Sequence, residues 1–231
     1  MQLLDAIGKF PDLQSLNLHQ SALKKPFSLK PKSPSGSSWP PNLTHLRINS
    51  HLPRETASWE ELITSLPEHL HSLAFDNCQN FHSLRQLSYF GVSSERILSV
   101  EAGLPRSEDE FPIHVITAAF PRIIHLSLPD STAPTFPPDG IRDQKSGIHL
   151  QSLTFTTGAD WKIMWLYGSH FSRPSLEDYI LAFPSLYKLK IPEHYYGHKS
   201  LRNSIDTLEE LLNRRAPPGS EEVAGLYSGP E

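Results

Sequence analysis

The sequence predicts an α/β solenoid of about seven irregular repeats, in which short parallel strands stack side by side. The first observation is a six-residue pattern, L/I-x-x-L-x-φ with φ apolar, that recurs along most of the 231 residues. A β-strand presents every second side chain to the same face, so this pattern gives each strand one apolar face. The pattern occupies 13–18, 43–48, 70–75, 123–128, 150–155 and 186–191, with a weaker copy at 95–100.

The second observation is the spacing of these copies. The central apolar residues are Leu16, Leu46, Leu73, Leu98, Leu126, Leu153 and Leu189. Four of the six intervals between them fall in the 20–29 residue range of leucine-rich repeats, and the other two need only loop insertions. One such unit cannot bury its apolar face alone, so several units must stack into one continuous core.

The third observation is the approach to the strands. A short amphipathic helical stretch ends at an apolar residue followed by proline at Phe10-Pro11, Leu66-Pro67, Phe120-Pro121 and Phe183-Pro184. Proline disfavours helix at the residue before it, so the helix ends there and an extended segment follows. The order helix, proline, strand is therefore expected four times.

The segment 183–191, which reads F-P-S-L-Y-K-L-K-I, resembles irregular leucine-rich-repeat domains of the F-box-associated type common in fungi. The resemblance covers roughly residues 3–192. It implies a horseshoe with parallel strands on the concave side and helices and loops on the convex side. The chain departs from that family in two ways. Only the third copy has a cysteine, Cys78, where the family has Asn or Cys, and because repeat material starts at Met1 we expect the F-box to be absent.

The elements between the strands differ along the chain. Helices are predicted at 2–10, 58–66 and 81–90, from 107 onward, and at 200–215. The polar, Pro/Ser-rich segment 20–42 and the segment 129–149 are predicted to be loops. Apolar residues at helical spacing make the helix at 200–215 a C-terminal cap; they are Leu201, Ile205, Leu208, Leu211 and Leu212. We expect one domain over 1–215 and a disordered tail over 216–231.

Composition narrows the partners and the compartment. The net charge of −4 argues against bulk electrostatic binding of nucleic acid. The single cysteine excludes an internal disulfide and favours a reducing compartment, the cytoplasm or nucleus. The N-terminus does not look like a signal peptide, and no stretch approaches the roughly 20 apolar residues of a membrane span. We expect an intracellular protein that is monomeric.

Two candidate surfaces for binding a protein partner follow. The segment 160–171 carries Trp161, Trp165, Tyr167 and Phe171, which are typical interface anchors; the alternative is that they pack over a widened repeat as core. The other surface is the outward side of the strands, where the candidates are His45, Arg47, Lys188 and Lys190. The positions just before and just after the central apolar residue of each copy point outward and line up from strand to strand in two columns. In the fourth copy, where Leu98 is taken as central, these positions are Ile97 and Ser99.

The sequence contains no catalytic constellation, cofactor motif or metal-ligand set. His45 and His125 share a column but lie three repeats apart, about 14 Å at the usual strand spacing, which is too far for one metal ion. We therefore expect a non-catalytic scaffold that binds a protein partner. Two alternatives stay open: a substrate-recognition subunit, or fragment, of an SCF-type ubiquitin ligase, as the resemblance implies, and a truncated, degenerate repeat protein without present function.

Overall fold

The structure is a computed structural model that describes residues 7–19, 39–49, 63–76, 93–102, 112–129, 147–156, 183–190 and 209–219. The chain forms two compact units. The N-terminal unit comprises Met1–Pro105 and Val115–Ile123, and the C-terminal unit comprises Arg106–His114 and Ile124–Glu231.

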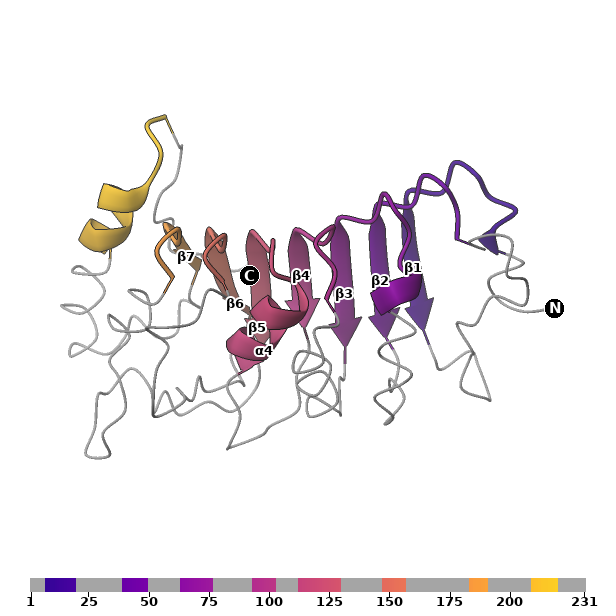
Figure 1. Cartoon of the computed structure of the whole chain (residues 1–231), viewed down its shortest axis with the longest axis horizontal. Coiled ribbons are helices and arrows are strands. Elements are labelled where there is room, and N and C mark those ends of the chain that lie inside the picture. Colours follow the sequence, from indigo (N-terminus) through magenta and orange to yellow (C-terminus); the bar gives the residue numbers. More distant parts are fainter. Residues whose placement is uncertain are drawn as a thin grey trace, which may run out of the picture. The chain divides into compact units, whose positions relative to one another are not determined.

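Seven strands form one parallel sheet in chain order (Figure 1). The N-terminal unit contributes four strands and the C-terminal unit three. They are β1 (Ser15–His19), β2 (His45–Asn49), β3 (Ser72–Asp76), β4 (Ser99–Ala102), β5 (His125–Pro129), β6 (Ser152–Thr156) and β7 (Lys188–Lys190). The predicted α/β class and the order of the strands are confirmed.

The register places equivalent positions of the pattern beside one another in each unit. Leu16 pairs with Leu46, and Leu46 pairs with Leu73. In the C-terminal unit Leu126 pairs with Leu153, which pairs with Leu189. Since neighbouring residues of a strand point to opposite faces, this register gives every strand one apolar face and one polar face.

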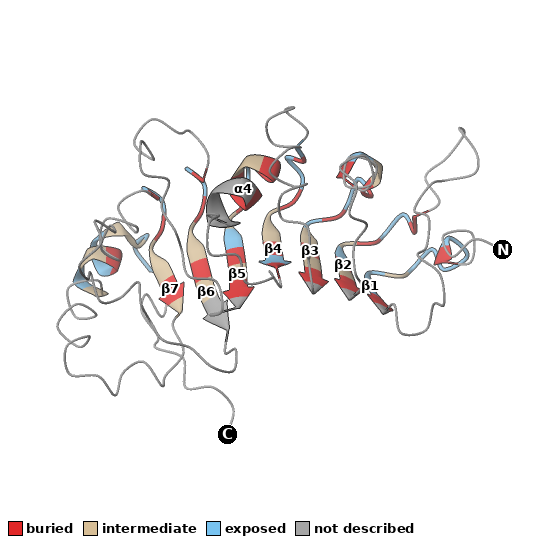
Figure 2. Cartoon of the chain, turned by 90° about the horizontal axis from the view of Figure 1, so that it is seen from below, coloured by how far each residue is buried: buried red, intermediate tan, exposed pale blue. Residues whose placement is uncertain are grey.

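The apolar face forms the core of each unit. Leu46, Leu73 and Leu153 are almost completely buried, whereas the residues directly before and after each of them on its strand are half-buried or exposed (Figure 2). On the edge strand β1, by contrast, Leu16 is only half-buried. The alternation predicted from the sequence is therefore present.

Six of the strands begin two residues later than the sequence pattern suggests. The first apolar residue of each copy lies in a tight turn and donates its N–H to the carbonyl three residues earlier, as in Leu13 to Phe10 at 3.2 Å and Leu186 to Phe183 at 3.0 Å. The same bond recurs before β2, β3, β5 and β6, from Leu43, Leu70, Ile123 and Leu150. Proline follows the accepting residue in four of these turns, where its fixed φ suits the second turn position. The side chain of the first residue is still buried in most copies.

The predicted register of the fourth strand is wrong by two residues. Ser72 pairs with Ser99 and Leu73 pairs with Val100, so Ile97, Val100 and Ala102 occupy the three apolar positions and are buried. Leu98, expected in the core, is only half-buried. Burial explains the shift: this alignment buries an isoleucine at the first position, where the predicted one would have buried Glu95.

Helices flank the strands. Helix α4 (Pro112–Ala119) begins at a proline, which the first helical position tolerates because its N–H would have no helical partner. Ile116 and Ala119 are fully buried, and the Ser94 N–H donates to the Ala119 carbonyl at 2.9 Å. In the N-terminal unit a helical turn at 63–65 lies to one side of the strands (Figure 2).

The described part of the predicted C-terminal cap is helical at 209–215. Leu212 is buried, and Arg215 donates hydrogen bonds to the Phe183 carbonyl at 3.1 Å and the Leu186 carbonyl at 3.5 Å. Both acceptors belong to the turn before β7. The described part of the predicted cap is therefore attached to the turn before β7.

Candidate functional site

The polar face of the N-terminal unit carries an ion pair that spans three strands. Arg47 on β2 pairs with Ala74 on β3, and Ala74 pairs with Glu101 on β4. Because the alanine side chain is short, the Arg47 guanidinium reaches across it and donates a hydrogen bond to the Glu101 carboxylate. The side chains are 37% and 49% exposed, so solvent screens much of their attraction.

His45 lies on the same face, at the start of β2. Its Nδ1 is 2.8 Å from the hydroxyl of Thr44, which in turn donates to the Gln14 carbonyl at 3.1 Å. Thr44 thus links this exposed imidazole to the backbone just before β1, which restricts the directions that the ring can take.

The polar face of the C-terminal unit has a different charge pattern. His125 on β5 pairs with Ser152 on β6, which pairs with Lys188 on β7. Although the His125 side chain is exposed, neighbouring atoms remove part of its hydration, and this desolvation lowers its pKa below the usual 6.5. The Lys188 ammonium lowers the pKa further. At neutral pH His125 is therefore an uncharged imidazole beside a cation.

One position further along the same face, Ser127, Thr154 and Lys190 form a second row in the same way. Thr154 pairs with Lys190, and Ser127 pairs with Thr154. All three are half-buried. The two rows together present hydroxyls, an imidazole and two ammonium groups.

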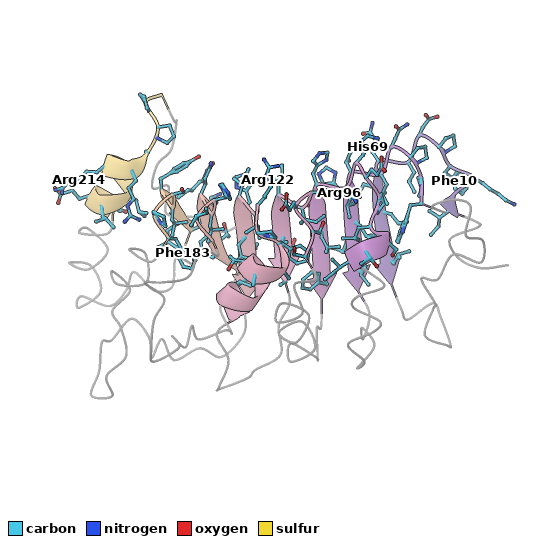
Figure 3. The ribbon with its side chains drawn as sticks, in the orientation of Figure 1. Phe10, His69, Arg96, Arg122, Phe183 and Arg214 are labelled. Atoms are coloured by element: carbon cyan, nitrogen blue, oxygen red, sulfur yellow. The ribbon has the colours of Figure 1, made fainter. Side chains whose placement is uncertain are left out.

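The edge at which the strands of the N-terminal unit begin has a separate exposed surface. Phe10 is 63% exposed in the turn before β1, and His69 is exposed in the turn before β3 (Figure 3). These side chains come from turns that precede strands and not from the strand faces. Their exposure was not predicted from the apolar pattern.

The structure places four of the predicted site residues on the polar strand face, in two separate groups. His45 and Arg47 lie on β2 of the N-terminal unit, and Lys188 and Lys190 lie on β7 of the C-terminal unit. The aromatic candidates Trp161, Trp165, Tyr167 and Phe171 fall outside the described residues, so both readings of that segment stay predictions.

Glu101 is a residue of this face that the sequence reasoning missed. The outward position that Glu101 occupies on the fourth strand was expected to be Ser99, because Leu98 was taken as the central apolar residue. Ile97-x-x-Val100-x-Ala102 fits the general pattern if valine and alanine are accepted at the second and third apolar positions. The intervals would also have indicated this alignment, because Leu73, Val100 and Leu126 are separated by 27 and 26 residues.

Two findings concern other kinds of site. Within the described ranges, no three His, Cys, Asp or Glu residues come together as they would around a metal ion. A search of the same ranges for a helix of sufficient length and apolarity to cross a membrane found none.

Comparison of the chain with protein-family models, with curated proteins and with solved structures gave no match.

Proposed function

We propose that this chain is a leucine-rich-repeat solenoid that serves as a non-catalytic scaffold and binds a protein partner through the polar face of its strands. The observation that carries the proposal is the difference between the two faces of the strands. The apolar face of each strand is used for the core, and the opposite face carries polar and charged side chains in aligned rows. Aligned rows on parallel strands form a surface on which one partner can contact several repeats together.

The repeat interpretation is supported by hydrogen bonds that recur from strand to strand. The carbonyl just before one strand accepts two N–H groups from the start of the next strand, as Gln14 does from Thr44 and His45 at 2.9 and 3.0 Å. Thr44, His71, Ile124 and Gln151 accept in the same way. A repeating unit of chain accounts for such equivalent bonds more simply than unrelated local structures do.

The chemistry of the rows favours binding over catalysis. Ser152 lies beside His125, the pairing that a nucleophilic serine and its general base would need. Among the contacts of the described residues, however, no hydrogen bond joins these two side chains, and the strand's N–H groups are used by the sheet and so cannot stabilise an oxyanion. This arrangement supports a scaffold.

Site-specific photo-crosslinking tests the proposal. A photoreactive phenylalanine analogue is introduced at Asn17 or Ser127, which lie on the polar face, or at the exposed turn residue Glu68 as a control. We expect the same partner protein to be captured from at least one face position and not from Glu68. Capture only from Glu68, or from none of the three, would contradict the proposal.

A further inference from the structure

Strand β1 forms an edge of the sheet, and among the described residues no strand lies on its outer side. Alternate residues of a strand hydrogen-bond to the same neighbour. The Gln14 carbonyl accepts from the start of β2, so every second residue after it also faces β2. The backbone N–H and C=O groups that face away from β2 therefore belong to Ser15, Asn17 and His19. Groups of this kind are a template for pairing with a further strand.

Three apolar side chains at this edge are more exposed than their equivalents in the other copies of the apolar pattern. Phe10 is 63% exposed (Figure 3), and Leu13 and Leu16 are half-buried. In the other six copies the residues at these three positions are buried, even at β7, the other edge strand, where the helix at 209–215 is attached to the preceding turn. The β1 edge therefore leaves apolar surface in water that a neighbouring chain would cover.

The composition of β1 does not protect its edge. Natural proteins commonly prevent pairing of edge strands with lysine or proline. The edge strand β7 reads K-L-K, whereas β1 reads S-L-N-L-H and contains no proline, lysine, arginine, aspartate or glutamate. No fixed charge on β1 therefore opposes the approach of a second strand.

The sequence of β1 is complementary to itself when two copies run antiparallel about Asn17. Asn17 then lies opposite its own copy, and Ser15 lies opposite His19 of the second copy. These are the residues whose backbone groups face outward, so about six hydrogen bonds can form between the strands. A two-fold axis perpendicular to the sheet keeps both apolar faces on one side. It therefore places Leu16 beside Leu18 of the second copy, where the two side chains cover each other.

We propose that two copies of this chain associate through β1, antiparallel about Asn17, and join the sheets of their N-terminal units. The proposal departs from the monomer expected from the sequence. It uses the edge of the sheet and not the polar face, so it is independent of the proposed function. Two five-residue strands make a small contact compared with the roughly 1,600 Å² of a standard interface, so association is reversible and in the micromolar range.

Sedimentation velocity of the full chain tests the proposal at concentrations of about 1–200 µM. We expect the average mass to rise with concentration from 26.0 kDa toward twice that value and no further, because a two-fold contact closes on itself. A mass that stays at 26.0 kDa would overturn the proposal and leave the edge to a strand of another protein. Growth beyond the dimer would also overturn it, because it indicates a contact that does not close.

Charged substitutions at Asn17 distinguish this contact from any other. Because Asn17 lies opposite itself, Asn17→Lys or Asn17→Asp brings two like charges together and should raise the dissociation constant about fivefold or more. An equimolar mixture of the two variants brings opposite charges together and should restore association. The control Ser127→Lys, at the equivalent position of β5, should change the dissociation constant less than about twofold. A mixture that associates no better than either variant alone would refute the contact through β1.

A covalent readout is independent of charge and serves if the charged variants unfold. In a Cys78→Ser background, Asn17→Cys places two thiols across the axis, with Cα atoms about 5.5 Å apart, within the range of a disulfide. We expect mild oxidation to give a covalent dimer on a non-reducing gel, whereas Ser127→Cys in the same background remains monomeric. No dimer from Asn17→Cys, or equal dimer from both variants, would contradict the proposal. Neither result would affect capture of a partner from Ser127, which tests the scaffold separately.

Discussion

At the scale of single residues, a short side chain determines what its neighbours can do. Ala74 permits Arg47 and Glu101 to meet across β3, although the two lie on strands that are not adjacent. A larger residue at that position would separate them. The ion pair on the polar face therefore depends on the register of β2, β3 and β4 as well as on the opposite charges of its two residues.

The ion pair itself should contribute little to stability. Both partners are more than a third exposed, and exposed pairs contribute roughly 0.2–1 kcal/mol. A double-mutant cycle with Arg47→Ala and Glu101→Ala, followed by urea unfolding, should give a coupling energy within that range. A coupling above about 2 kcal/mol would show that solvent screens the pair far less than its exposure suggests.

The core positions of β4 give a sharper prediction. Ile97 is fully buried and Leu98 is half-buried. Ile97→Ala should lower the free energy of unfolding by about 2–5 kcal/mol, the range for a buried isoleucine, and Leu98→Ala by roughly half as much or less. Chemical denaturation of the two variants compares them directly. A larger loss from Leu98→Ala would restore the register expected from the leucine spacing.

His125 predicts a pH dependence of stability. Its folded-state pKa lies below 6.5, so the unfolded chain binds the proton more readily, and protonation favours unfolding. This histidine's contribution is therefore fully present above about pH 6.5 and is lost as the pH falls through the window below that value. NMR titration should report a pKa below 6.5 for His125.

The variant Lys188→Gln tests what lowers the pKa of His125. Removal of the ammonium should raise the pKa of His125 only in part, because desolvation is the larger cause and remains. The same variant should reduce the loss of thermal stability in mild acid. An unchanged His125 titration in the variant would mean that the lysine charge does not reach the ring.

At the scale of elements, six of the described strands follow a hydrogen-bonded turn, and β7 is also connected to a helix through its turn. The guanidinium of Arg215 joins the helix at 209–215 to two carbonyls of the turn before β7. Arg214, one residue earlier, is 71% exposed and pairs only with Glu210 of the same helix among the contacts described (Figure 3). Adjacent arginines thus have different structural roles.

These two arginines form a natural pair of variants. Arg215→Ala should lower the free energy of unfolding by about 1.5–3 kcal/mol, because two carbonyls lose a charged donor. Arg214→Ala should change it by about 0.5 kcal/mol or less, as expected for an exposed i,i+4 pair. Thermal denaturation followed by circular dichroism measures both. Equal effects of the two substitutions would contradict the role of Arg215 in the cap.

At the scale of the whole molecule, the repeat of apolar residues was sufficient to predict the class of fold, the order of the strands and their apolar faces. It predicted six strands in the correct register because leucine, isoleucine or phenylalanine marks each one. It failed at β4, where valine and alanine take two of the three positions and the nearby Leu98 imitates the pattern. The position of a leucine therefore predicted the register of β4 less well than the need to bury Ile97 would have done.

The polar face was less predictable for a physical reason. The pattern fixes which positions point outward, but a pairing such as Arg47 with Glu101 depends on the register between strands that are distant in sequence. The lysines of β7 were predicted because that copy follows the pattern closely. The charge difference between the two units became visible only when β4 was aligned correctly.

The measurement that tests this account most directly is disulfide formation between pairs of introduced cysteines, in a Cys78→Ser background. Ser72 and Ser99 are register partners, with Cα atoms about 4.8 Å apart, within the range that a disulfide spans. Ala74 and Ser99 would be partners in the alternative register and here lie about 8 Å apart, beyond that range. We predict that Ser72→Cys/Ser99→Cys oxidises readily and that Ala74→Cys/Ser99→Cys does not. The reverse result would contradict the register of β4 and, with it, the arrangement of the polar face.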